Sequence, residues 1–354
     1  MTWMIGIDEA GYGPNLGPLC IGATAWWSEL QAECSEEPKD MPLREGGLAL
    51  VRTGSTIDLY GRLADVVSRV PDDQRIAIAD SKQLYKPAGH SKQRHSKRRH
   101  SNCGLRHLER GVLTAMTACG QSFTDWQELF SPPTLPWYAD YNCPLPIDCS
   151  LAEVANLADR FAVTCQSAAV ELVDIQTQLV YPEEFNQLTE HYGTKGAALS
   201  HKSMDLVKKV LANLPIRSSL CIPPHTPLVS ITCDKHGGRN RYGALLQHHF
   251  PDHWIETIVE SRSQSFYRWG PPEANIEICF RSQGEAELPV ALASMQAKYH
   301  RELAMRAFNA FWIEQIPGLR PTAGYPQDAK RFKAQITEVQ AKLKIEDRVL
   351  WRNR

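Results

Sequence analysis

The first 27 residues hold the pattern that most restricts how this chain can fold. An apolar run, Met1 to Ile7, closes on the acidic pair Asp8-Glu9, and a second apolar run, Cys20 to Trp27, follows a turn rich in glycine and proline. Short apolar runs on either side of such a turn are typical of buried strands. They predict an antiparallel hairpin that opens a sheet and carries two carboxyl groups at the end of its first strand.

The rest of the chain predicts a mixed α/β architecture in which helices flank this sheet. Apolar runs indicate further strands at 170–180, 228–233, 255–259 and 276–280. Helical spacing indicates helices at 62–70, 105–119, 151–167, 182–190, 201–214, 285–312 and 327–344. We expect one domain over residues 1–330, with insertions near 28–75, 86–104, 120–150 and 235–280. Residues 331–354 are expected to form a C-terminal helical extension.

Charge and cysteine content exclude some classes of protein. The 39 basic and 40 acidic residues give a net charge of −1, which argues against a protein that coats nucleic acid but allows a local basic patch. The basic stretch 92–99 is either a solvated loop or a nucleic-acid contact. None of the 10 cysteines forms a C-x-x-C pair, and neither a signal peptide nor a run of about 18 apolar residues is present. We therefore expect a cytoplasmic protein with reduced thiols.

Acidic residues end two of the predicted strands, at Asp8-Glu9 and at Asp234. A carboxylate at the end of a buried strand is costly unless it is paired, hydrogen-bonded or bound to a cation. Several carboxylates at one sheet edge form the oxygen-rich site that Mg²⁺ prefers. Two such ions about 4 Å apart can activate water and stabilise a leaving oxygen on phosphate. The alternative is that each acid only forms a turn where its strand ends.

Five blocks of sequence resemble the motifs of the type 2 ribonuclease H family, and they occur in the order that the family has. They are Gly6-Ile7-Asp8-Glu9-Ala10-Gly11-Tyr12-Gly13-Pro14, Asp80-Ser81-Lys82-Gln83-Leu84, Asp234 after its strand, Gly284 to Glu302, and Gly324-Tyr325-Pro326-Gln327-Asp328. The chain departs from the family at Tyr12, where the family has arginine, and at the fourth acid, which the family alignment would place on Gly284, one residue before Glu285.

The resemblance implies a ribonuclease H-like mixed sheet flanked by helices and a metal-dependent endonuclease. Its substrate would be RNA in an RNA–DNA hybrid, or ribonucleotides embedded in DNA. Two divalent ions, Mg²⁺ or Mn²⁺, would be held by Asp8, Glu9, Asp234 and Glu285, with Glu287 as the fallback for the last position. Two alternatives stay open: a nuclease of the same fold for other structured nucleic acid, and a binding module without catalysis.

The resemblance also implies substrate contacts. Gly11, Tyr12 and Gly13 would form the turn at the 2′-hydroxyl, and Tyr325 would pack there. Lys82, in the second block, would contact phosphate, and Lys298, in the fourth block, would bind substrate. Separately, Arg239 and Arg241 follow Asp234 closely and form either a phosphate clamp or a polar loop.

Overall fold

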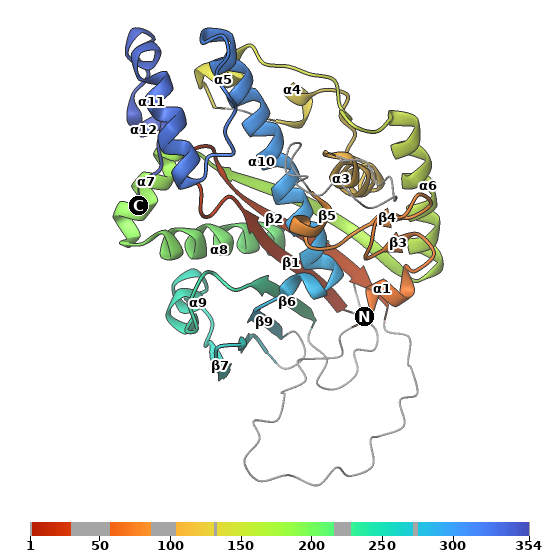
Figure 1. Cartoon of the computed structure of the whole chain (residues 1–354). Coiled ribbons are helices and arrows are strands. Elements are labelled where there is room, and N and C mark those ends of the chain that lie inside the picture. Colours follow the sequence, from red (N-terminus) through yellow and green to blue (C-terminus); the bar gives the residue numbers. More distant parts are fainter. Residues whose placement is uncertain are drawn as a thin grey trace, which may run out of the picture.

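The computed structural model describes residues 2–29, 57–85, 104–130, 133–215, 228–271 and 275–353. Within these ranges, seven strands form one mixed sheet in the order β5-β2-β1-β6-β9-β8-β7 (Figure 1). The strands are β1 (Thr2–Ala10), β2 (Leu19–Ser28), β5 (Val170–Val180), β6 (Val229–Asp234), β7 (Glu256–Glu260), β8 (Gln264–Trp269) and β9 (Ile276–Arg281). The mixed α/β class expected from the sequence is confirmed.

Strand register brings the predicted acids to one edge of this sheet. β1 pairs antiparallel with β2, from Thr2 opposite Ser28 to Ala10 opposite Cys20, as the hairpin pattern predicted. On its other side β1 runs parallel to β6, with Ile7 opposite Cys233. Because parallel strands end at the same edge, the residues that follow this pair, Asp8 and Asp234, lie beside each other.

Helices cover both faces of the sheet, and each face has its own apolar core (Figure 1). One core contains Trp26 and residues of α3 (Arg106–Ala118), α6 (Leu151–Ser167), α10 (Leu288–Gln315) and α11 (Pro326–Lys342). The other contains Trp27 and residues of α7 (Pro182–Tyr192), α8 (Lys195–Asn213) and α9 (Gly243–His249). Adjacent residues of one strand thus serve opposite cores, as the pleat requires. None of the described helices is both long and apolar enough to span a membrane.

Several short elements complete the described chain. They are α1 (Leu59–Arg62), β3 (Val67–Ser68), β4 (Ile76–Ala77), α2 (Ser81–Leu84), α4 (Trp126–Leu129), α5 (Pro136–Ala139), η2 (Gly284–Ala286) and α12 (Asp347–Leu350). Two of these elements lie at the edge of the sheet where the acids meet. Helix α2 follows β4, and η2 lies between β9 and α10.

Two glycines allow α10 to lie directly on β1 and β2. A Cβ built on Gly6 would lie 2.1 Å from the carbonyl carbon of Pro289, and one built on Gly22 would lie 2.2 Å from the carbonyl oxygen of Ala293. Atoms cannot approach so closely, so any larger residue at either position has to displace the helix. The glycines therefore set the position of α10, which carries the residue Ser294 beside Asp8.

Replacing Gly22 with alanine is expected to lower the free energy of unfolding by about 3 kcal/mol, because the added methyl group overpacks a rigid contact between helix and strand. Urea unfolding followed by circular dichroism measures this. Gly238→Ala is the matched control, since no described heavy atom lies within 4 Å of a Cβ at that position. Equal stability of the two variants would contradict the proposed role of Gly22.

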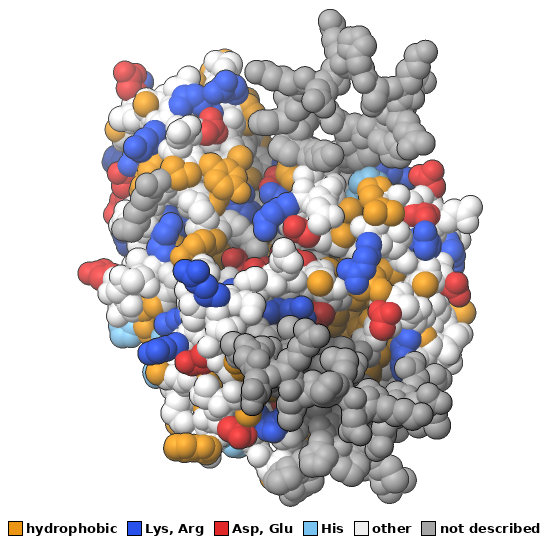
Figure 2. All heavy atoms as spheres, turned by 60° about the horizontal axis from the view of Figure 1, so that its bottom comes forward, with side chains coloured by type: hydrophobic (Ala, Val, Ile, Leu, Met, Phe, Trp, Pro, Cys, Tyr) orange, Lys and Arg blue, Asp and Glu red, His pale blue; other side chains and the backbone are white. Residues whose placement is uncertain are grey.

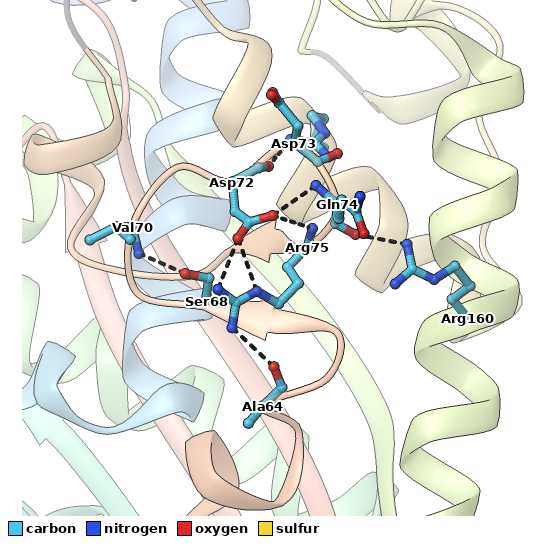
Figure 3. A network of polar contacts seen from close by, with 9 residues as sticks. Ala64, Ser68, Val70, Asp72, Asp73, Gln74, Arg75 and Arg160 are labelled. Carbon is cyan, nitrogen blue, oxygen red and sulfur yellow. Dashed lines mark hydrogen bonds and ion pairs between the residues drawn. The ribbon is translucent and has the colours of Figure 1, made fainter.

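The segment 62–70, predicted as one helix, is organised differently. Helix α1 ends at Arg62, and Val67 begins β3, which pairs parallel with β4. β-branched residues favour extended backbone, and Asp72 then closes a turn by accepting hydrogen bonds from the backbone nitrogens of Gln74 and Arg75 at 2.7 and 3.0 Å (Figure 3). The Arg75 guanidinium also donates to Asp72 (Figure 3). This side-chain turn favours the strand pair over a continuous helix.

The stretch 235–280, expected as an insertion, contributes to the main sheet. It supplies α9, β7 and β8, and β8 was not predicted. The arginine in QSFYRW obscures the alternation of apolar and polar residues that would indicate a strand. In the structure, Arg268 donates from Nε to the Glu277 carboxylate on the neighbouring strand at 2.9 Å. Of the other predicted insertions, 86–103 and much of 28–75 lie outside the described residues, and so does the basic stretch 92–99.

Candidate metal centre

Three carboxyl groups converge at the edge where β1 and β6 end. Asp8 belongs to β1, Asp234 is the last residue of β6, and Glu285 lies in η2, just before α10. Each offers one carboxylate oxygen, and these oxygens all lie within 4.8 Å of one another. Asp8 is buried, whereas Asp234 and Glu285 are half-buried, so the cluster opens toward solvent on one side.

Short hydrogen bonds hold two of these carboxylates in place. The Asp8 Oδ1 atom accepts from the backbone nitrogen of Glu9 at 2.8 Å, and Asp234 Oδ1 accepts from the backbone nitrogen of Gly284 at 3.2 Å. Ser294, on α10, hydrogen-bonds Asp8, and its Oγ atom also lies within hydrogen-bonding distance of Ser81 Oγ of α2, at 3.1 Å. The three elements that surround the cluster are therefore tied to it and to each other.

The electrostatics of the cluster favour a bound cation. Burial raises the pKa of Asp8 well above its usual range, and the charges of Glu9, Asp234 and Glu285 raise it further, while the Ser294 hydrogen bond lowers it. Burial also raises the pKa values of Glu9, Asp234 and Glu285. Negative groups this close repel one another unless a proton or cation lies between them. Oxygen ligands in this density suit a hard divalent cation, so the residues fit Mg²⁺ or Mn²⁺.

Glu9 and Lys82 lie at the margin of the cluster. Glu9 raises the pKa of Asp8 through its charge, but it is not among the three residues whose oxygens meet within 4.8 Å. Lys82 follows the α2 N-cap Asp80, whose side chain accepts from the Lys82 backbone nitrogen at 3.0 Å. Its Nζ lies 3.9 Å from Glu285 Oε1, and its side chain is 81% exposed. One exposed ammonium group does not balance the neighbouring carboxyl groups.

Glu285 and Glu287, the two candidates for the fourth acid, have different surroundings. Glu285 points into the cluster. Glu287 instead accepts from Arg281 Nη1 at 2.7 Å and from Thr232 Oγ1 at 2.8 Å. The geometry thus favours Glu285 as the metal ligand. Glu287 directly precedes α10 and forms an ion pair with Arg281 of β9.

The glycine-rich turn lies beside Tyr325. Gly11 has a φ of +89°, and a Cβ built on it would lie 2.4 Å from Arg301 Nε, so this glycine is required by the packing of the turn itself. A Cβ on Gly13 would lie 3.7 Å from Cε1 of Tyr325, whose side chain is 55% exposed. The two residues therefore form one accessible surface.

Tyr12 points away from this surface, toward the beginning of α8. Its hydroxyl lies 3.5 Å from the Cβ position of Gly196 and 3.8 Å from that of Gly237, and Lys195 Nζ lies 5.4 Å from the centre of its ring. A lysine thus stands near the position where the family motif has arginine. Sequence reasoning missed Lys195, because nothing in the pattern linked residue 195 to residue 12.

Three predicted phosphate contacts are engaged elsewhere. Lys298 Nζ pairs with Glu302 Oε1 at 2.6 Å and lies 4.6 Å from the centre of the Tyr85 ring. Arg241 is exposed, with Nε 3.7 Å from Glu260 Oε2, and the Arg239 guanidinium lies 5.6 Å from the centre of the Tyr242 ring. None of these cations belongs to the described carboxylate cluster, so their roles in binding stay predictions.

The C-terminal segment supports the glycine-rich turn, and sequence reasoning missed this too. Arg352 is fully buried, and its Nη2 atom donates to the carbonyl oxygens of Gly11, at 2.6 Å, and Pro14. The Arg352 backbone nitrogen donates to the carbonyl of Asn15 at 2.8 Å. Burial lowers the pKa of Arg352 to about 9, so the group still carries its charge at neutral pH. Figure 1 shows this end of the chain beside α7.

Replacing Arg352 with alanine is expected to loosen residues 11–18 and to lower the free energy of unfolding by about 2–3 kcal/mol, because hydrogen bonds from a charged donor to two carbonyls are lost. Hydrogen exchange of these amides and urea unfolding measure the two effects. Arg262→Ala is the control: Arg262 is an exposed arginine in the turn between β7 and β8, and its loss should leave both measurements nearly unchanged. Unaltered exchange in Arg352→Ala would contradict the supporting role.

Among known proteins, solved structures match this chain. No family model and no curated protein matches the chain significantly. Solved structures do match over 99% of its length: RNase HII of Archaeoglobus fulgidus in a complex with PCNA (13% identity, 94% of that chain covered, TM-score 0.37), ribonuclease H2 of Pyrococcus horikoshii (13%, 92%, 0.38), and Bst-RNase HIII in complex with Mn²⁺ (11%, 66%, 0.36). The chain is thus similar to these solved ribonucleases over nearly its whole length.

Proposed function

We propose that this protein is a metal-dependent endonuclease that cleaves RNA in RNA–DNA hybrids or at ribonucleotides embedded in DNA. The observation that carries the proposal is the convergence of Asp8, Asp234 and Glu285, whose carboxylate oxygens lie within 4.8 Å of one another. Each belongs to a block of sequence that resembles the type 2 ribonuclease H motifs.

The chain supplies ligands and supports for this chemistry. Asp8, Asp234 and Glu285, with Glu9 at the margin, would hold two Mg²⁺ or Mn²⁺ ions. When bound, such ions lower the pKa of an attacking water and neutralise charge on a phosphate. Ser294 and the Gly284 backbone nitrogen hold the carboxylates in position, and the mostly exposed Lys82 can bind a phosphate oxygen of the incoming strand.

The surface of the described residues favours local recognition of substrate over general attraction. In Figure 2, basic and acidic side chains are interspersed, and neither sign covers the face shown. This agrees with the net charge of −1. We propose that a nucleic acid duplex is held mainly at the carboxylate centre and at the surface formed by Gly13 and Tyr325. The free cysteines among the described residues, such as Cys20 and Cys233, suit a reducing compartment, and we propose that the protein works in the cytoplasm.

A nuclease of the same fold with another substrate is the second candidate. The position of Tyr12 favours it, because a tyrosine directed toward Lys195 and α8 replaces the arginine of the family motif. A structured DNA or RNA would then be the preferred substrate. A panel of hybrid, embedded-ribonucleotide, single-stranded and branched substrates separates the two candidates.

The proposed function is tested by cleavage of a labelled hybrid in the presence of Mg²⁺ or Mn²⁺, with a chelator as the negative control. Glu285→Gln is expected to lower the rate about tenfold, equivalent to about 1.4 kcal/mol, because a charged ligand becomes a neutral one. Glu287→Gln is the matched control and should stay within about twofold of the parent, since its carboxylate bonds Arg281 and Thr232 instead.

Two outcomes would contradict this assignment. If the purified protein cleaves no substrate of the panel with either metal, the proposal of an endonuclease is wrong and a binding module takes its place. If Glu287→Gln loses more activity than Glu285→Gln, the fourth ligand has been assigned to the wrong residue, and the carboxylate centre includes the beginning of α10 itself.

A further inference from the structure

Three histidines from two helices meet on the side of the sheet opposite α10. His201 lies on α8, and His248 and His249 are the last two residues of α9. Each offers one ring nitrogen, and these nitrogens all lie within 4.8 Å of one another. His201 Nδ1 and His249 Nε2 are only 3.0 Å apart. His249 is buried, His201 is half-buried and His248 is exposed, so one side of the cluster is open to solvent.

Neighbouring groups orient these rings as they do in protein metal sites. Asp205 Oδ1 lies 3.7 Å from Nδ1 of His249, which directs that nitrogen toward the carboxylate and leaves Nε2 facing His201. Metal-bound histidines commonly present their second nitrogen to a carboxylate in this way. The Tyr192 ring stacks on His201 with centres 3.7 Å apart and fixes that ring as well.

We propose that His201, His248 and His249 form a binding site for one first-row transition-metal ion, and Zn²⁺ is the ion chosen for the test because three histidines are an established zinc ligand set. Zinc–nitrogen bonds are about 2.0–2.1 Å long, so nitrogens at this spacing reach one ion after small rotations of the exposed His248 side chain. Imidazole ligands select such ions over Mg²⁺, which prefers oxygen. The site is therefore chemically separate from the carboxylate centre and does not depend on the cleavage reaction.

A metal ion at this site would join α8 to α9 and so hold the segment that follows Asp234. This segment, residues 235–242, connects β6 to α9. It is already linked to α8 at one point, where His236 Nδ1 lies 3.0 Å from Ser200 Oγ. The ion would thus stabilise the fold at a second point on this segment.

The test is calorimetric titration of Zn²⁺ into the full-length protein without a polyhistidine tag. Saturating Mg²⁺ is present to occupy the carboxylate centre. Because residues 90, 95 and 100 are also histidines, all three are replaced by glutamine in the parent protein. We expect about one equivalent of Zn²⁺ to bind with a Kd below about 1 µM and to raise the Tm, since an ion that binds only the folded state stabilises it.

His248→Gln is the decisive variant, because His248 is exposed and its replacement should not disturb folding. It is expected to weaken Zn²⁺ binding at least about tenfold and to abolish the rise in Tm; His201→Gln should do the same. His253→Gln, another exposed histidine near the end of α9, is the control and should bind as the parent does. Zn²⁺ affinity that is unchanged in His248→Gln and His201→Gln, or absent from the parent, would overturn the proposal and leave a simple hydrogen bond between two rings.

Discussion

Replacing either Asp8 or Asp234 with asparagine is expected to lower the rate of hybrid cleavage by at least about 10³-fold, equivalent to about 4 kcal/mol of transition-state stabilisation. Asparagine has nearly the shape of aspartate but no charge, so it binds a divalent cation poorly. The side chains of Asp8 and Asp234 meet Glu285 within 4.8 Å, and the loss of one charged ligand should affect every ion held there. Single-turnover cleavage and calorimetric titration of Mg²⁺ measure the two losses.

The same substitution is expected to preserve or increase stability in the absence of metal. The pKa of Asp8 is raised by burial and by neighbouring carboxylates, so the folded protein favours its protonated form. Stability from this group is therefore present below the usual aspartate pKa and is lost as the pH rises through the raised value. Asp8→Asn removes that loss, and its free energy of unfolding should exceed that of the parent at neutral pH.

Asp252→Asn, at an exposed aspartate, is the control for both measurements and should change neither. Asp8→Asn protein that retains more than about a tenth of the parent rate would exclude a catalytic metal at this position. Asp8→Asn protein that is inactive but also unfolded would contradict the electrostatic argument, because relief of repulsion cannot unfold a protein.

The elements that sequence predicted well are those whose pattern is local. The hairpin of β1 and β2 follows from two apolar runs and one glycine-rich turn, and the structure pairs them from Thr2 to Ala10. The segment 62–70 was predicted wrongly because side-chain hydrogen bonds of Asp72 favour a turn that hydrophobic spacing does not report. Strand β8 was not predicted because it contains the charged residue Arg268. The carboxylate that pairs with Arg268 belongs to Glu277 on the neighbouring strand, which the local sequence does not reveal.

The carboxylate centre was predictable for a related reason. Asp8 and Asp234 each end an apolar run, and parallel pairing brings such ends together. The supports were not predictable, since Arg352 reaches Gly11 from 341 positions along the chain. The contact between Gly11 and Arg301, which occupies the Cβ position of this glycine, was not predictable either, and substrate binding by Gly11 stays a prediction. Packing of this kind depends on tertiary structure, and no spacing in the sequence encodes it.

Sugar discrimination is the second large effect that we expect. A DNA duplex with one embedded ribonucleotide should be cleaved at least about 10³-fold faster than the same duplex made only of DNA, because a site that hydrogen-bonds a hydroxyl strongly rejects the analogue without it. Gly13 and Tyr325 form the surface proposed for this contact, with 3.7 Å between the Gly13 Cβ position and the tyrosine ring. The 2′-hydroxyl is the group that distinguishes RNA from DNA.

Tyr325→Ala is expected to lower the ribose preference about tenfold while leaving the titration of Mg²⁺ unchanged, because we propose that the ring packs on the sugar, and it is not part of the carboxylate cluster. Trp254→Ala is the matched control, since Trp254 is the more exposed aromatic residue, at 85%, and lies on a different loop. Tyr12→Arg restores the residue of the family motif, but we expect only a few-fold gain at the embedded ribonucleotide, because Lys195 Nζ already lies 5.4 Å from the Tyr12 ring. Equal cleavage of all-DNA and ribose-containing duplexes by the parent protein would contradict sugar recognition by this surface, while the carboxylate centre would keep its separate support from Asp8→Asn and Asp234→Asn.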